Sequence, residues 1–123
     1  LWLGGSALDD AALADALARL TGLEFLVVHA TGVGDATAHA LGGLPNLNTL
    51  HLSDTAVTDG GLRGLGRARS IEFLSLSETA VTDAGIAHLV EVVSLETLQT
   101  DDTAVTEAGR MVLTQLPKLF ELG

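Results

Sequence analysis

Apolar residues recur along the 123-residue chain at a fixed interval of 24 residues. The most regular column consists of Leu26, Leu50, Leu74, Leu98 and Leu122. A second column lies three residues earlier and consists of Leu23, Leu47, Ile71, Leu95 and Leu119. A repeat of this length predicts a solenoid, in which each unit buries its apolar side chains against its neighbours. About five units and the start of a sixth cover residues 1–123, so we expect a single repeat array. Because the pattern is already under way at residue 1, we expect a fragment of a longer chain.

Each unit changes its hydrophobic period within its own length. Leu50-His51-Leu52 alternates apolar and polar residues, which predicts a short strand with one face buried. After Val57 the apolar residues follow at steps of three and four, as in Leu62 and Leu65, which predicts an amphipathic helix. Stacked units of this kind predict an α/β solenoid with a parallel inner sheet and helices on the outer, convex side.

A second motif marks the start of each predicted helix. Residues 55–59 read Thr-Ala-Val-Thr-Asp and return as residues 79–83, and residues 103–107 differ only in a final Glu. The acid lies at the positive end of the helix dipole, and a capping hydroxyl precedes it at Thr58, Thr82 and Thr106. Glycine recurs two residues beyond the acid, at Gly61, Gly85 and Gly109. Glycine costs a helix about 0.5–1 kcal/mol relative to alanine, so its recurrence indicates that backbones approach closely at this position.

The full pattern, Leu-x-x-Leu-x-Leu-x-x-Thr-x-Val-Thr-Asp-x-Gly-Leu, resembles the leucine-rich repeat family over the whole chain. Threonine replaces the family's usual turn asparagine, at Thr31, Thr55, Thr79 and Thr103. The Val-Thr-Asp-x-Gly-Leu block is similar to bacterial Thr-type repeats and to the cysteine-containing repeats of F-box proteins, although this chain has no cysteine. The resemblance implies a curved horseshoe whose inner sheet binds protein partners.

The fifth unit departs from the pattern at two positions. Thr100 stands where earlier units carry an inward leucine, and Arg110 stands where they carry Leu62 and Ile86. Terminal units of solenoids are atypical because one side lacks a neighbouring unit, so we expect the array to end nearby. Leu119 and Leu122 restore the pattern, which predicts at least one further strand.

The strand alternation assigns a set of side chains to the solvent-facing, concave side of the sheet. Three of the chain's four aromatic residues, Trp2, Phe25 and Phe73, fall on this side. Exposed rings are typical anchors of protein interfaces. We therefore predict that a partner binds the concave residues Trp2, Phe25, Val27, His29, Thr49, His51, Phe73, Ser75 and Gln99. The alternative is that preceding units or a flanking domain cover Trp2 and Phe25.

The net charge of the chain limits the classes of partner that it can bind. The chain holds 6 Lys and Arg against 16 Asp and Glu, a formal net charge of −10, which argues against nucleic acid and anionic membranes. Carboxylates line one edge of the predicted sheet, at Asp54, Glu78, Asp101 and Asp102. We call these four residues the acidic rim, and the simplest interpretation of the rim is a solvated edge. The functional alternatives are a steering surface for a basic protein and a calcium site.

Composition gives little support to catalysis or to a cofactor. The absence of cysteine removes disulfides, thiol chemistry and cysteine-based metal sites, and favours an intracellular location. No apolar run reaches the roughly 18 residues of a membrane span, and no signal peptide is visible. His51 and Ser75 share a row but lack an orienting carboxylate, while His29 and His51 fall short of the three or four ligands of a zinc site. We expect no enzyme activity, catalytic residue, metal or cofactor.

These observations favour non-catalytic protein recognition or scaffolding through the concave face. Two other functions agree with the same repeat. The chain could be an architectural subunit of a large assembly, which would use its ends and convex helices. It could also be the substrate-recognition module of a larger protein, such as a ubiquitin ligase or an effector.

Overall fold

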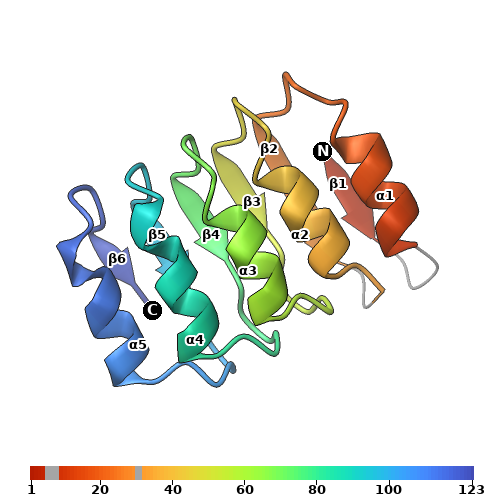
Figure 1. The fold of residues 1–123 in the computed structure, drawn as a ribbon. Helices are drawn as coiled ribbons and strands as arrows, with labels where there is room; N and C mark the ends of the chain where they lie inside the picture. Colours follow the sequence, from red (N-terminus) through yellow and green to blue (C-terminus); the bar gives the residue numbers. More distant parts are fainter. Residues whose placement is uncertain (5–8, 30–31) are drawn as a thin grey trace.

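The computed structural model describes residues 1–4, 9–29 and 32–123. The described residues form a parallel six-stranded sheet whose spatial order follows the sequence from β1 to β6. The strands are β1 (Trp2–Gly4), β2 (Phe25–His29), β3 (Thr49–His51), β4 (Phe73–Ser75), β5 (Thr97–Gln99) and β6 (Glu121–Leu122). The sheet is open and curved, as Figure 1 shows. The predicted α/β solenoid is therefore confirmed.

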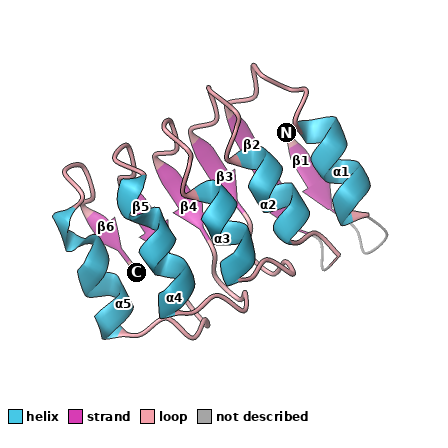
Figure 2. Cartoon of the chain, viewed as in Figure 1, coloured by secondary structure: helices cyan, strands magenta, loops and turns pink. Residues whose placement is uncertain are grey.

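The helices connect successive strands and cover one face of the sheet, as Figure 2 shows. They are α1 (Asp10–Leu17), α2 (Asp35–Leu41), α3 (Asp59–Leu65), α4 (Asp83–Ile86) and α5 (Glu107–Val112). The last two continue as 3₁₀ turns, η1 (Ala87–Glu91) and η2 (Leu113–Gln115). The other face of the sheet carries no helix among the described residues, so the concave side is open.

The strand register superposes the leucine column of the sequence. Leu26 pairs with Leu50, Leu50 with Leu74, Leu74 with Leu98 and Leu98 with Leu122. The first interval is one residue longer, since Leu3 pairs with Val28. The further strand expected around Leu119 and Leu122 is present as β6.

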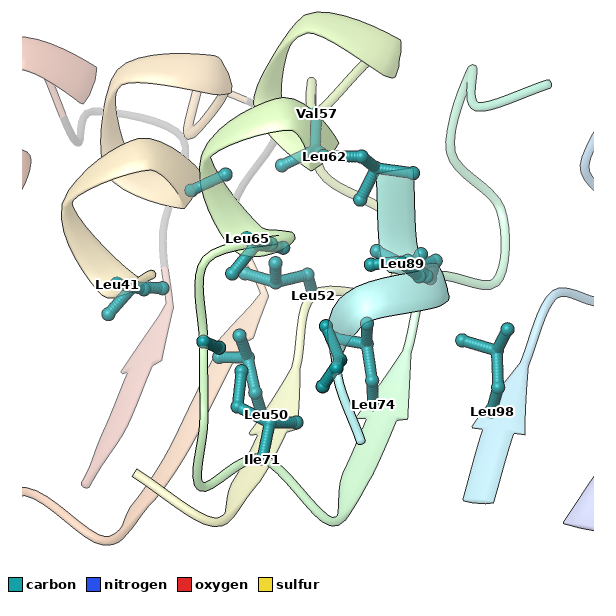
Figure 3. Packing of buried hydrophobic residues seen from close by; sticks show 14 of the residues in the cluster. Leu41, Leu50, Leu52, Val57, Leu62, Leu65, Ile71, Leu74, Leu89 and Leu98 are labelled. Carbon is teal, nitrogen blue, oxygen red and sulfur yellow. The ribbon is translucent and has the colours of Figure 1, made fainter. Parts of the chain in front are cut away.

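The core is a continuous layer of aliphatic side chains between the sheet and the helices. Leu50 and Leu74 from the strands, and Leu62, Leu65 and Leu89 from the helices, are 0–1% exposed. Figure 3 shows these leucines filling the space between the two layers. Each such side chain contributes about 1.5–3 kcal/mol when it is fully buried. Because the strands and helices of neighbouring units pack against one another and share one core, the stability of one unit depends on its neighbours.

A tight turn follows the strands, and the threonine column stabilises it. The hydroxyl groups of Thr55, Thr79 and Thr103 each donate a hydrogen bond to the main-chain carbonyl three residues earlier, at 2.6–2.7 Å. Thr55 and Thr79 are buried, so the bond satisfies a hydroxyl that water does not reach. Thr31 lies outside the described residues.

Carboxylates connect each unit to the next at the start of the helices. Asp35 accepts hydrogen bonds from the amide and the hydroxyl of Thr58, at 2.7 and 2.6 Å. Asp59 binds Thr82 in the same way, and so does Asp83 with Thr106. The Thr106 hydroxyl and amide hold the pKa of the Asp83 carboxyl below its ordinary value. We call these contacts the Asp–Thr bridges.

The first unit has a related contact. Burial raises the pKa of Asp10, but hydrogen bonds from Thr37, Gly34 and Ala36 outweigh it and leave a net lowering. These bonds run from the amides of all three residues to the carboxylate, at 2.9–3.0 Å. An acid therefore links the first helix to the second, although the partner is the helix start itself and not a capping threonine.

Two of the three predicted caps are confirmed, and the helix glycines occupy crowded positions. Thr58 and Thr82 accept a hydrogen bond from the amide two residues later, at 3.3 Å, but Thr106 accepts none among the described residues, so the third prediction is wrong. The helix glycines are in contact with the preceding unit, and a Cβ at Gly61 would lie 2.7 Å from an Asp35 oxygen. The nearest atoms at Gly61, Gly85 and Gly109 are side-chain atoms, chiefly those of the bridging carboxylate, so the predicted approach of backbones is wrong at these positions.

The two irregular residues of the fifth unit are accommodated differently. Thr100 is buried, and its hydroxyl donates a hydrogen bond to the carbonyl of Gly123 at 2.7 Å. The Nε atom of Arg110 is buried and has no hydrogen-bond partner among the described residues. The substitution at Thr100 is therefore satisfied, whereas the substitution at Arg110 leaves a polar atom without a partner.

Candidate partner-binding face

Aromatic rings from four neighbouring strands form a ladder across the concave face. The ring centroids of Trp2 and Phe25 lie 6.4 Å apart, those of Phe25 and His51 6.0 Å, and those of His51 and Phe73 4.7 Å. Strands β1 to β4 each supply one ring, because the register brings these positions to the same face of adjacent strands. Trp2 is 73% exposed and Phe25 is 41% exposed. The predicted aromatic surface is therefore continuous; it is open to solvent at Trp2 and Phe25 and half-buried at His51 and Phe73.

A pocket of about 270 Å³ lies at the first half of this ladder. Five of its lining residues are predicted site residues, namely Trp2, Phe25, Val27, His29 and His51. Val28 and Ser53 also line it and were missed by the sequence prediction. Alternation along a strand assigns Val28 to the core side, and Ser53 follows the strand in the turn. No periodic signal in the sequence would have placed Val28 in the site, whereas Ser53 lies 24 residues after the predicted site residue His29, so the repeat itself indicated its face.

Two predicted site residues are buried, which corrects the expectation that the whole concave row is exposed. Val27 is 5% exposed, since it lies in register between Trp2 and His51 and forms part of the pocket wall. Ser75 is 2% exposed. Its short side chain lies between larger neighbours, and its hydroxyl pairs with that of Ser53 at 2.7 Å. Alternation gives the face of a side chain, but the size of the flanking residues decides its exposure.

The remaining predicted residues extend the face beyond the ladder. His29 is exposed at the end of β2, and Gln99 is half-buried on β5. Thr49 is half-buried, and its hydroxyl donates a hydrogen bond to the side-chain oxygen of Asn48 at 2.8 Å. The structure thus brings Trp2, Phe25, His29 and His51 into one pocket, and leaves Gln99 two strands away.

The acidic rim is exposed, and its backbone gives Asp54 and Asp102 a structural reason as well. Asp54, Glu78 and Asp102 have φ angles of 57°, 60° and 57°, in the left-handed region. Aspartate tolerates this conformation better than most residues with a Cβ. The amides of Asp54 and Glu78 donate hydrogen bonds to Ser77 and Asp101 carbonyls of the next turn. The turn therefore explains an aspartate at the position, while leaving its carboxylate free to face solvent.

The lysine and arginine side chains come from residues outside the described strands. None of the six Lys and Arg residues lies in a described strand; they are Arg19, Arg63, Arg67, Arg69, Arg110 and Lys118. Two of the three arginines around α3 have structural contacts on the convex side. Arg67 donates to the His39 carbonyl at 3.0 Å, and Arg69 donates to the Arg67 carbonyl at 3.0 Å. Within the described residues one ion pair forms, between Arg19 and Asp15 at 3.3 Å, so the rim carboxylates have no cation beside them.

Burial favours the neutral form of His51, the histidine of the ladder. Burial among the rings lowers the pKa of His51 below its ordinary value. Ser75, the other half of the conceivable dyad, uses its hydroxyl on Ser53. Over the described ranges, no three His, Asp or Glu side chains gather closely enough to hold a metal ion. The chemistry of the face is that of an apolar, partly aromatic contact surface.

Comparison with solved structures supports the fold. The structure of the leiomodin-1 actin-binding site 2 is similar to this chain, with a TM-score of 0.64 and 17% sequence identity. The similarity covers 92% of this chain and 77% of that one. The chain has a leucine-rich-repeat fold. At this identity the likeness to leiomodin-1 concerns the fold alone. No protein-family model and no curated protein matches the sequence. Among the described helices, none has the length and apolar character needed to cross a membrane.

Proposed function

We propose that the chain is a non-catalytic protein-recognition module that binds its partner through the concave face of the sheet. The observation that carries this proposal is the aromatic ladder of Trp2, Phe25, His51 and Phe73, in which Trp2 and Phe25 are exposed and the other two rings are half-buried. Contiguous apolar surface is costly to leave in water, and aromatic anchors dominate the energetics of protein interfaces. Leiomodin-1 uses a similar fold in its actin-binding site 2, so protein binding is compatible with this architecture.

The repeat type is part of the same proposal. The side chain at the turn position donates to the main chain in three units, from Thr55, Thr79 and Thr103. A threonine hydroxyl therefore satisfies the turn where leucine-rich repeats commonly use asparagine. We assign these units to the Thr-type class on that basis.

Substitutions in the ladder test the function. Phe25→Ala and Phe73→Ala are expected to preserve the circular dichroism spectrum, because neither ring belongs to the core between sheet and helices. Each is expected to weaken capture of a purified partner by about tenfold or more, as for interface anchors. Phe120→Ala is the matched control, since Phe120 is 74% exposed and makes no ring contact with the ladder in the described structure.

The architectural alternative makes the opposite prediction. In that case the partner contacts the convex helices or the ends of the solenoid, and ladder variants bind normally. Met111 lies on α5 and is 62% exposed, so Met111→Ala reports on that surface. Partner capture that survives Phe25→Ala and Phe73→Ala but is lost with Met111→Ala would remove the concave face from the interface.

A further inference from the structure

We infer that the pocket beside Trp2 and Phe25 receives a bulky apolar side chain from a basic protein segment, whose lysines and arginines lie along the acidic rim. The inference rests on the proposed function, since it assumes that the concave face binds protein. It adds the chemical class of the bound segment and the place where its anchor residue lies.

The chemistry of the pocket favours an apolar anchor. Its walls include the rings of Trp2 and Phe25 and the side chain of Val27, and no Asp, Glu, Lys or Arg lines it among the described residues. Its volume of about 270 Å³ lies just below the roughly 300–1,000 Å³ of small-molecule sites. A single large side chain therefore suits the pocket better than a free ligand.

Charge complementarity identifies what surrounds the anchor. The pocket residue Ser53 is followed directly by Asp54, the first residue of the acidic rim. The rim continues across the next turns through Glu78 and Asp102. Neighbouring strands are about 4.8 Å apart, so these three carboxylates span about 10 Å, the reach of about three extended residues. Cations within the few residues beside the anchor would therefore lie opposite the rim.

The opposite end of the strands has the same sign of charge. Glutamates precede or begin four of the strands, at Glu24, Glu72, Glu96 and Glu121. The described strands contain no Lys or Arg. The apolar ladder is thus flanked by carboxylates on both sides, and a segment crossing it meets negative charge before and after the pocket.

The same charge excludes other occupants of this face. A second copy of the chain would bring a further formal charge of −10 and its own acidic rim, so like charges would face each other. Nucleic acid and anionic lipid are repelled for the same reason. A cationic protein segment with one apolar anchor satisfies both the pocket and its surroundings.

Selection from a displayed library of random dodecapeptides tests the inference. Selected peptides are expected to be enriched in Lys and Arg next to one bulky apolar residue. Their binding is then measured by fluorescence anisotropy with synthetic copies. Replacing the apolar residue by serine, or the cations by glutamine, is expected to weaken binding by about tenfold in each case.

Matched protein variants locate the contact. Phe25→Ala is expected to weaken peptide binding by about tenfold. The triple change Asp54→Asn, Glu78→Gln, Asp102→Asn is expected to do the same at low salt and less at high salt. Asparagine tolerates the left-handed backbone at Asp54 and Asp102, and circular dichroism checks the fold. The control triple Asp9→Asn, Asp15→Asn, Glu91→Gln removes the same charge outside the strands and rim, and is expected to change binding less than about threefold.

The outcomes separate the inference from the proposed function. The inference would be overturned if the selected peptides were not enriched in Lys or Arg. It would also be overturned if the two triple variants weakened peptide binding equally. If those peptides still lose binding with Phe25→Ala, protein recognition by the concave face stands without it. Two results would overturn the inference and count against the function as well. One is that no peptide is selected, and the other is that the affinity of the selected peptides is unchanged by both Phe25→Ala and Phe73→Ala.

Discussion

The carboxylate of Asp59 binds Thr82, 23 residues later in the chain, through two hydrogen bonds. The Thr82 amide donates one at 2.7 Å and the hydroxyl donates the other at 2.6 Å. The Thr82 hydroxyl in turn accepts a hydrogen bond from Ala84 at the start of α4. The repeated Thr-Asp pair therefore has two functions, because its threonine caps the start of its own helix and its aspartate binds the capping threonine of the next unit.

Asp59→Ala is expected to destabilise the array. The change removes two charge-assisted hydrogen bonds and leaves the Thr82 amide with one partner fewer, which costs about 2–3 kcal/mol. Urea denaturation followed by circular dichroism measures the change in the free energy of unfolding. Asp15→Ala is the control, since Asp15 forms an exposed ion pair with Arg19 that is worth about 1 kcal/mol or less. Equal losses in the two variants would remove the Asp–Thr bridge as a stabilising contact.

Gly85→Ala is expected to destabilise the protein even though alanine is the better helix former. Alanine gains about 1 kcal/mol over glycine in a helix interior. A Cβ at Gly85, however, would clash with the carboxylate and side chain of Asp59 and crowd Leu62. We expect a net loss of about 1–3 kcal/mol, as for other overpacked sites, measured by thermal or urea unfolding.

The same clash predicts how two changes combine. Asp59→Ala removes the crowding carboxylate, so Gly85→Ala is expected to cost less in that background than in the wild type. Gly22→Ala is a control with no described atom within 4 Å of the added Cβ, and little change is expected. Additive effects of the Asp59 and Gly85 variants would show that the glycine is needed for another reason.

Thr79→Val tests the turn hydroxyl. Valine keeps the shape of the buried side chain but removes the hydrogen bond to the Leu76 carbonyl, which is 2.6 Å long. The carbonyl then lacks that partner, so we expect a loss of about 1–2 kcal/mol in urea unfolding. Thr79→Ser keeps the hydroxyl and is expected to retain more of the stability than the valine variant. The reverse order would indicate that the methyl group, and not the hydroxyl, stabilises the turn.

Arg110→Leu is expected to stabilise the fifth unit. The guanidinium Nε is buried without a partner in the described structure, whereas Leu62 and Ile86 fill the same position in earlier units. Leucine removes the unpaired polar atom and adds apolar burial, for a gain of about 1–2 kcal/mol. The charge of Arg110 also contributes to lowering the pKa of Asp83, so part of this gain is lost. Thermal unfolding measures the net change, and a lower midpoint would contradict the prediction.

The sequence predicts the strands and their register well because the evidence repeats in every unit. An error of one residue would move every leucine of a strand off the core, so the column from Leu26 to Leu122 specifies the pairing. The recurrent glycines also indicated a close contact correctly. The identity of the contacting group did not follow, because the carboxylate of Asp59 comes from the preceding unit and a single sequence does not pair it with Gly85.

The sequence predicted which face of the sheet carries the candidate site, but not how deeply each of its residues is buried. The alternation placed Trp2, Phe25 and His51 on one surface, and the structure joins them in a ladder. It did not predict that Val27 and Ser75 are buried, because their exposure depends on the sizes of their cross-strand neighbours. The left-handed turn at the acidic rim was also missed, since aspartate at such a position reads equally well as surface charge.

Binding of a basic segment is expected to weaken as the pH falls, because His51 gains a positive charge within the aromatic ladder. Burial lowers the pKa of His51, so the ring is neutral above its ordinary value of about 6.5 and becomes charged only as the pH falls through the lowered value. Between the lowered value and about 6.5, the folded state binds fewer protons than the unfolded state. The stability of the fold therefore also falls as the pH falls through this range. We expect affinity to be constant between about pH 7 and 8 and to fall as the pH drops below the ordinary histidine pKa of about 6.5 toward the lowered value. His51→Phe keeps a ring in the ladder and is expected to remove most of this dependence, while His29→Gln tests the other histidine of the pocket. A pH profile unchanged by His51→Phe would exclude His51 as its cause.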